Sequence, residues 1–165
     1  MDISHDITYQ YVARVKKHDD ELGIVLKGHL LLEHVMNLMI EKGFKQPRAI
    51  LSDHRSYSFS VKARLLFESN DLPEHVFNNI TRLNRIRNEL AHKLNLDEAK
   101  IDFCYSRNDK EGQREINLKQ VVKKNSNPLK RYLYMLAFGT LSQIQREFFQ
   151  RYGTYPLFEK TIELK

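Results

Sequence analysis

Residues 83–92 read Leu-Asn-Arg-Ile-Arg-Asn-Glu-Leu-Ala-His and lie within a longer helical pattern. At about 100° per residue, the apolar residues around this stretch fall within one arc, which is the core face of an amphipathic helix. Arg87 projects only about 40° from the centre of that arc. A partly buried guanidinium is costly unless it is paired or hydrogen-bonded. The apolar residues are Val76, Ile80, Leu83, Ile86, Leu90 and Leu94.

A polar ridge runs beside Arg87 on the same helix. Asn84, Asn88 and His92 are spaced four residues apart, so they share one edge of the helix. Arg87 and His92 themselves project about 140° apart. The two side chains therefore need not reach one phosphate within a single subunit, and a site built from two subunits is physically reasonable.

The segment from about residue 21 to 42 is predicted to be a helix that ends at Gly43, and it is apolar around most of its circumference. Such a helix is central in a bundle or packs against a second subunit. His29 and Glu33 interrupt its apolar surface, and a carboxylate in that position needs a cation. Arg87 is the expected partner of Glu33. Pairing of Glu33 with His29, or exposure of Glu33 to solvent, stays open as an alternative.

The remaining pattern predicts an all-α protein with a single domain over residues 1–165. We expect an antiparallel four- to five-helix bundle with a short β-hairpin or loop insertion before the last long helix. The expected elements are a short helix at 6–18, a connection at 45–57, helices at 58–69 and 73–94, alternating segments between 100 and 118, and a last helix from Asn127-Pro128 to about 151.

Composition limits the classes of partner and site. The formal net charge of +6 and a pI near 9.4 favour a polyanionic partner, although a basic protein without one fits as well. The single cysteine, Cys104, excludes an internal disulfide and a cysteine-rich zinc site, and the histidines lack ligand spacing. We therefore expect no metal and no cofactor. Without signal-peptide features or an uninterrupted apolar run, a cytoplasmic location is expected, with no membrane partner.

Arg87-Asn88-Glu89-Leu90-Ala91-His92 resembles the Arg-polar-x(3–5)-His signature of the HEPN superfamily (higher eukaryotes and prokaryotes nucleotide-binding). The preceding Leu83-Asn84-Arg85-Ile86 is similar to what that group often shows before the signature. Residues 28–33 and the Phe59…Lys62…Leu65-Leu66 segment resemble earlier helices of HEPN-like proteins related to the mannitol operon repressor. The resemblance covers roughly residues 20–95.

The resemblance implies a metal-independent endoribonuclease, or an inactive relative, that works as a homodimer with one composite site for RNA. Arg87 would bind the scissile phosphate, His92 would act as general acid or base, and Asn88 would orient the phosphate or the imidazole. Glu33 and Asn84 would support them. These roles agree with the chemistry of the two side chains, since a guanidinium binds phosphate well and an imidazole exchanges protons near neutrality. Such a protein could be a toxin with an antitoxin partner, or a phage-defence effector.

Arg82 and Arg85 are expected on the outer side of the helix, where they could contact RNA phosphates or be ordinary surface residues. His92 could equally be a solvated histidine near a helix end, favourable to the helix dipole. The main alternative function is a non-catalytic helical dimer, a transcriptional regulator or adaptor of the mannitol operon repressor type. A weaker one is binding of a nucleotide or another small ligand without cleavage.

Overall fold

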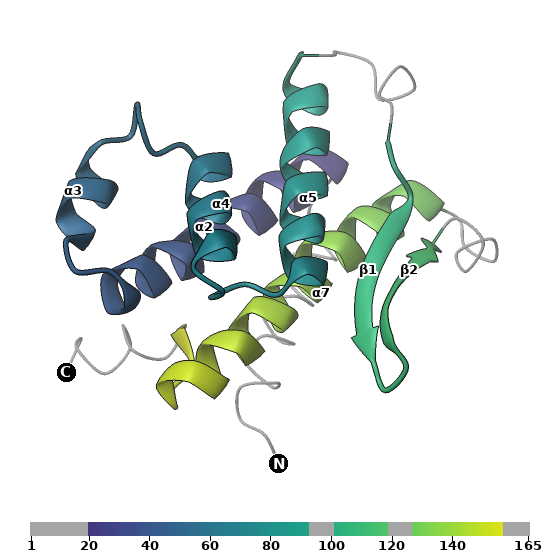
Figure 1. Ribbon diagram of the computed structural model, residues 1–165. Coiled ribbons are helices and arrows are strands. Elements are labelled where there is room, and N and C mark those ends of the chain that lie inside the picture. The colour runs from purple at the N-terminus through teal and green to yellow at the C-terminus, as the bar shows by residue number, and fades with distance from the viewer. Residues whose placement is uncertain (1–19, 93–100, 119–126, 157–165) are drawn as a thin grey trace, which may run out of the picture.

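The computed structural model describes residues 20–92, 101–118 and 127–156, so the helix expected over residues 6–18 lies outside the described part. The described chain is mainly helical, with one two-stranded antiparallel sheet (Figure 1). The expected hairpin before the last long helix is confirmed. The elements are α2 (Glu21–Gly43), α3 (Pro47–Ser52), α4 (Phe59–Glu68), α5 (Glu74–His92), β1 (Cys104–Asp109), β2 (Gly112–Asn117) and α7 (Pro128–Tyr152).

Local chemistry fixes the ends of the two longest described helices. The carboxylate of Asp20 caps α2 by accepting a hydrogen bond from the amide of Gly23 at 2.7 Å. The side chain of Asn127 caps α7 by accepting from the amide of Lys130 at 2.9 Å. Gly153 ends α7 with a φ of 72°, a left-handed conformation that glycine adopts without a Cβ clash. These boundaries agree with the sequence pattern.

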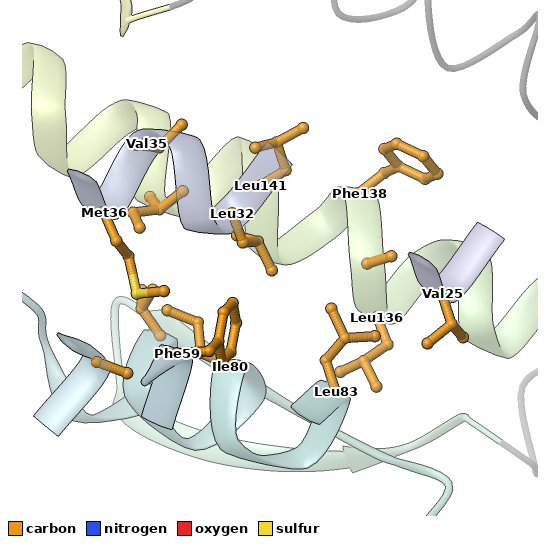
Figure 2. Packing of buried hydrophobic residues seen from close by; sticks show 14 of the residues in the cluster. Val25, Leu32, Val35, Met36, Phe59, Ile80, Leu83, Leu136, Phe138 and Leu141 are labelled. Atoms are coloured by element: carbon orange, nitrogen blue, oxygen red, sulfur yellow. The ribbon is translucent and has the colours of Figure 1, made fainter. Parts of the chain in front are cut away.

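The hydrophobic core lies where α2, α5 and α7 meet, with α4 covering α2 and α5. Figure 2 shows Leu32 of α2, Leu83 of α5 and Leu136 of α7 pointing toward one another, and all three are fully buried. Gly28 allows α2 to approach α7 closely, because a Cβ at this position would lie 2.5 Å from the Cβ of Ala137. Close packing of these helices thus depends on one small residue in α2.

The two longest described helices, α2 and α7, run side by side in the same direction (Figure 1). Near their N-termini, the side-chain amide of Asn127 donates to Glu21 at 2.8 Å. Near their C-termini, the hydroxyl of Tyr152 donates to the carbonyl oxygen of Met39 at 3.4 Å. The antiparallel expectation is therefore wrong for this pair. Short connections make neighbouring helices antiparallel, but these two are separated in the chain by all the other described elements.

Within the described residues, α2 is the helix long and apolar enough to cross a membrane by length and composition. Half of that stretch is buried inside the fold, and the helix packs against α5 and α7. A core helix has the same apolar character. The apolar side chains of α2 therefore contribute to the hydrophobic core.

The hairpin of β1 and β2 packs on α5 through buried polar groups. Asn79 of α5 is fully buried, and its side-chain amide donates to the carbonyl oxygen of Ser106 at 2.9 Å. The amide of Ser106 donates back to Oδ1 of Asn79 at 2.8 Å. This reciprocal pair satisfies groups that would be costly to bury alone, and it fixes the hairpin against one side of α5.

Candidate functional site

The polar ridge expected on α5 lies along a surface hollow of about 380 Å³, here called the His92 hollow. Asn84, Asn88 and His92 line it together with Arg85 and Glu89. Asn88 and His92 are exposed, whereas Asn84 is partly buried. The helix therefore presents an imidazole, two amides and a guanidinium at one solvent-accessible surface.

Arg87 lines a different hollow of about 460 Å³, here called the Arg87 hollow. Its walls come from α2, from the segment 54–60 and from α5. Asn84 and Asn88 border both hollows, and His92 lines only the His92 hollow. Within one chain, Arg87 and His92 thus line different hollows, and Asn84 and Asn88 lie between these hollows. This agrees with the angular separation expected from the helix.

The guanidinium of Arg87 is only partly satisfied. Its Nη1 donates to Oδ1 of the neighbouring Asn88 at 2.9 Å. Its Nε is buried and has no hydrogen-bond partner among the described residues. Guanidinium groups carry five N–H donors, and a buried donor without a partner is unfavourable. Arg87 therefore keeps binding capacity for an acceptor that the described part of the chain does not supply.

The expected pairing of Glu33 with Arg87 is wrong. Nζ of Lys62, on α4, lies 3.0 Å from Oε1 of Glu33, and the Lys62 side chain is only 1% exposed. The sequence did contain a signal, because Lys62 follows Phe59 by three residues and precedes Leu66 by four, which puts it in the apolar stripe of α4.

His29 of α2 contacts both α4 and α5. Its Nε2–H donates to Oδ1 of Asn84 at 3.2 Å, and its ring stacks on Phe59 with 3.7 Å between the ring centroids. Burial lowers the pKa of His29 below 6.5, and the hydrogen bond that His29 donates to Asn84 opposes this shift only in part. The imidazole is therefore neutral at pH 7. Asn84 thus joins α5 to α2.

The position expected for Arg82 is also wrong, because its side chain is 9% exposed and lies under the hairpin. It donates to Asp102 at 3.0 Å and to Glu115 at 2.6 Å. Burial lowers the pKa of Arg82, but the hydrogen bonds to Glu115 and Asp102 outweigh it, so the pKa is raised. The helical periodicity of α5 alone could not reveal that β1 and β2 cover this face of the helix.

Arg85 does lie on the outside, as expected. Its side chain is 54% exposed and pairs with Asp102 at 3.2 Å. An exposed pair of this kind contributes little to stability. Arg85 also lines the His92 hollow, so its charge can reach a ligand bound there.

Glu89 is a further residue of this surface that the sequence analysis did not single out. It lines the His92 hollow, and its Oε2 is buried without a hydrogen-bond partner in the described ranges. A buried carboxylate oxygen in that state favours the approach of a donor or a cation. Its place inside the Arg87–His92 motif was the available signal.

In residues 20–92, 101–118 and 127–156, no group of three or more His, Cys, Asp or Glu side chains is arranged to hold a metal ion. The polar groups of the two hollows are guanidinium, imidazole, amide, hydroxyl and carboxylate. Such a set can bind an anion and exchange protons. No family model, curated protein or solved structure matches this chain, so its resemblance to the HEPN superfamily rests on its own residues.

Proposed function

We propose that this protein is a metal-independent endoribonuclease of the HEPN type, a helical bundle that acts as a homodimer. The observation that carries the proposal is the arrangement of Arg87 and His92 in two hollows that both border Asn84 and Asn88. Arg87 is half-buried and has no carboxylate partner among the described residues, and His92 is an exposed imidazole. Together they supply a phosphate anchor and a proton carrier.

The proposed chemistry uses groups that the motif helix already presents. The guanidinium of Arg87 binds the scissile phosphate and stabilises the charge that develops during cleavage. Asn88 holds this guanidinium by accepting from Nη1 at 2.9 Å. His92 acts as general acid or base while the ribose 2′-hydroxyl of the RNA attacks the adjacent phosphorus. Because the RNA supplies its own nucleophile, the step requires no bound metal.

The proposal requires two subunits, since Arg87 and His92 line different hollows of one chain. An apolar stripe on α2 is suited to contact with a second copy: Leu22, Leu26 and Leu30 are spaced four residues apart and are 40%, 39% and 64% exposed. The net charge of +6 favours RNA. Arg85 contacts phosphates beside His92, whereas Arg82 serves the hairpin and is not assigned to RNA.

A second candidate function is a non-catalytic dimer that acts as a regulator or adaptor of the mannitol operon repressor type. The exposed leucine stripe of α2 favours it, because an apolar helix face can bind a regulatory protein partner. Both candidates imply a cytoplasmic protein. They differ in whether His92 performs chemistry.

The test is cleavage of a mixed single-stranded RNA pool in the presence of EDTA. We expect the wild type to leave 2′,3′-cyclic phosphate ends and His92→Ala to lose about 10²- to 10⁴-fold in rate. Added imidazole should restore part of the activity of His92→Ala. Arg48→Gln, an exposed arginine on α3, is the matched control for Arg87→Gln and should cleave normally.

Mixing two inactive variants tests whether the site is composite. In a heterodimer of Arg87→Gln and His92→Ala, one site regains an intact arginine and an intact histidine from different subunits. We therefore expect the mixture to cleave although neither variant does so alone. A folded wild-type dimer that fails to cleave any RNA would favour the regulator or adaptor instead.

A further inference from the structure

The Arg87 hollow contains an imidazole that the proposed cleavage does not use. His54 lines this hollow together with Arg87, although it lies 33 residues away in the chain. The carboxylate of Asp53 fixes the turn that carries His54 by accepting from the amides of Arg55 at 3.2 Å and Ser56 at 3.0 Å. This turn therefore places a second imidazole in the hollow that Arg87 lines.

The charge balance of this hollow is positive. Glu33 is its one lining carboxylate among the described residues, and the buried Lys62 neutralises it at 3.0 Å. His29 is hydrogen-bonded to Asn84, and burial lowers its pKa, so it adds no charge at pH 7. The charge of Arg87 is left without a carboxylate partner in the described chain. An anion is the ligand that this balance favours.

Hydroxyl groups complete the hollow on the side of α4. Ser58 precedes the helix and makes no side-chain cap, and its Oγ lies 3.1 Å from Oγ of Ser60. Both serines are exposed and line the hollow. The first-turn amides of α4 add donors on this side, because such amides have no acceptor within their own helix. Phosphate oxygens accept hydrogen bonds from all these groups.

We propose that the Arg87 hollow is a nucleotide-phosphate site within a single subunit, with Arg87 as its anchor and His54, Ser58 and Ser60 as its polar lining. Its volume of about 460 Å³ lies within the range of small-molecule sites. Tyr57 lines the same hollow and offers an aromatic surface for the attached base. The site holds the nucleotide that carries the phosphate bound by Arg87.

This inference deepens the proposed function in its choice of ligand, but binding at the Arg87 hollow does not require cleavage at His92. Its test uses the full chain labelled with ¹⁵N, titrated with uridine 5′-monophosphate, uridine and inorganic phosphate. We expect saturable NMR shifts for the amides of Ser58 and Ser60 and for Nε–H of Arg87. The nucleotide should bind, inorganic phosphate should bind more weakly, and uridine should cause little change.

Ser60→Glu gives the sharpest variant, because it places a carboxylate in the hollow and an acidic residue favours the first turn of a helix. We expect it to weaken nucleotide binding about tenfold or more, since it repels the phosphate and pairs with Arg87. Val61→Glu is the matched control. Val61 is also in the first turn of α4 and is 37% exposed, but it does not line the hollow, so affinity should change by less than about twofold.

Arg87→Gln should abolish most of the binding, whereas Arg48→Gln should leave it intact. His54→Ala should weaken it and leave the fold unchanged, since His54 is exposed. The proposal is overturned if the wild type shows no saturable shifts, if Ser60→Glu binds like the wild type, or if shifts occur only at residues of the His92 hollow such as Thr81 and Glu89. Absence of ribonuclease activity alongside these expected shifts would refute only the cleavage proposal.

Discussion

Arg82 and Arg87 lie five residues apart on α5 and have opposite environments. Arg82 is 9% exposed, pairs with Asp102 and Glu115, and also donates to Oδ1 of Asn79. Arg87 donates to Asn88, and its buried Nε has no partner in the described structure. Two arginines of one helix therefore differ in whether the fold itself uses their donors.

The difference separates a cation whose donors the fold uses from a cation whose donors are only partly used. A buried charge is tolerated when its hydrogen bonds are complete, and Arg82 meets that condition through the hairpin. An unpartnered buried donor lowers the stability of the fold. An external acceptor that completes the hydrogen bonds of Arg87 would remove this cost. That is the behaviour expected of a ligand-binding residue.

Replacement of each arginine in turn should give the largest difference in stability. Arg82→Ala should lower the free energy of unfolding by about 3 kcal/mol, the lower end for a broken buried pair, because Asp102 and Glu115 are themselves 35% and 56% exposed. Arg87→Ala should lower it by less than about 1 kcal/mol, since no carboxylate loses a partner. Urea denaturation measures both values.

Arg85→Ala is the control for this pair of variants, since Arg85 is 54% exposed and shares Asp102 with Arg82. It should change stability by about 0.5 kcal/mol. Equal losses for Arg82→Ala and Arg87→Ala would show that the contrast does not hold in solution.

A second, smaller effect concerns the pair of Lys62 and Glu33, which keeps Arg87 available. Glu33→Ala should cost about 2 kcal/mol, because it leaves Lys62 unpaired at 1% exposure. Lys62→Met should cost less, since it fits the apolar stripe and Glu33 is 29% exposed. The double variant should be more stable than Glu33→Ala alone. Strictly additive losses in urea denaturation would contradict the pairing.

The smallest effect is a change in the pKa of His29, measured by NMR titration of its ring. Burial already holds this pKa below 6.5, and the hydrogen bond that His29 donates to Asn84 raises it in part. Asn84→Ala should therefore lower the pKa of His29 further. His75 is the control, because burial lowers its pKa without any contribution from Asn84; its pKa should not change.

The sign of the linked stability effect follows from this direction. As the pH falls below 6.5, the unfolded chain binds a proton at His29 that the folded chain does not bind. The free energy of unfolding therefore decreases as the pH decreases. The contribution is complete above that pH. Asn84→Ala should widen the pH range over which stability is lost, and an unchanged or narrower range would contradict the assigned hydrogen bond.

Much of the architecture could be predicted from the chain. Asp20, Asn127 and Gly153 mark helix ends through local hydrogen bonds and backbone geometry, and the alternation between residues 101 and 118 gave the hairpin. The ridge of Asn84, Asn88 and His92 followed from helical spacing alone. These features depend on residues close in sequence, so periodicity and capping rules are sufficient to find them.

The partners of the charged residues could not be predicted, because each lies on another element. Lys62 takes Glu33 from α2, and the hairpin covers Arg82. The order of residues along α5 is enough to establish that this helix carries a guanidinium, two amides and an imidazole at fixed angles. That Arg87 shares a hollow with His54 follows from tertiary packing alone, since α2, the 54–60 segment and α5 meet to create that hollow.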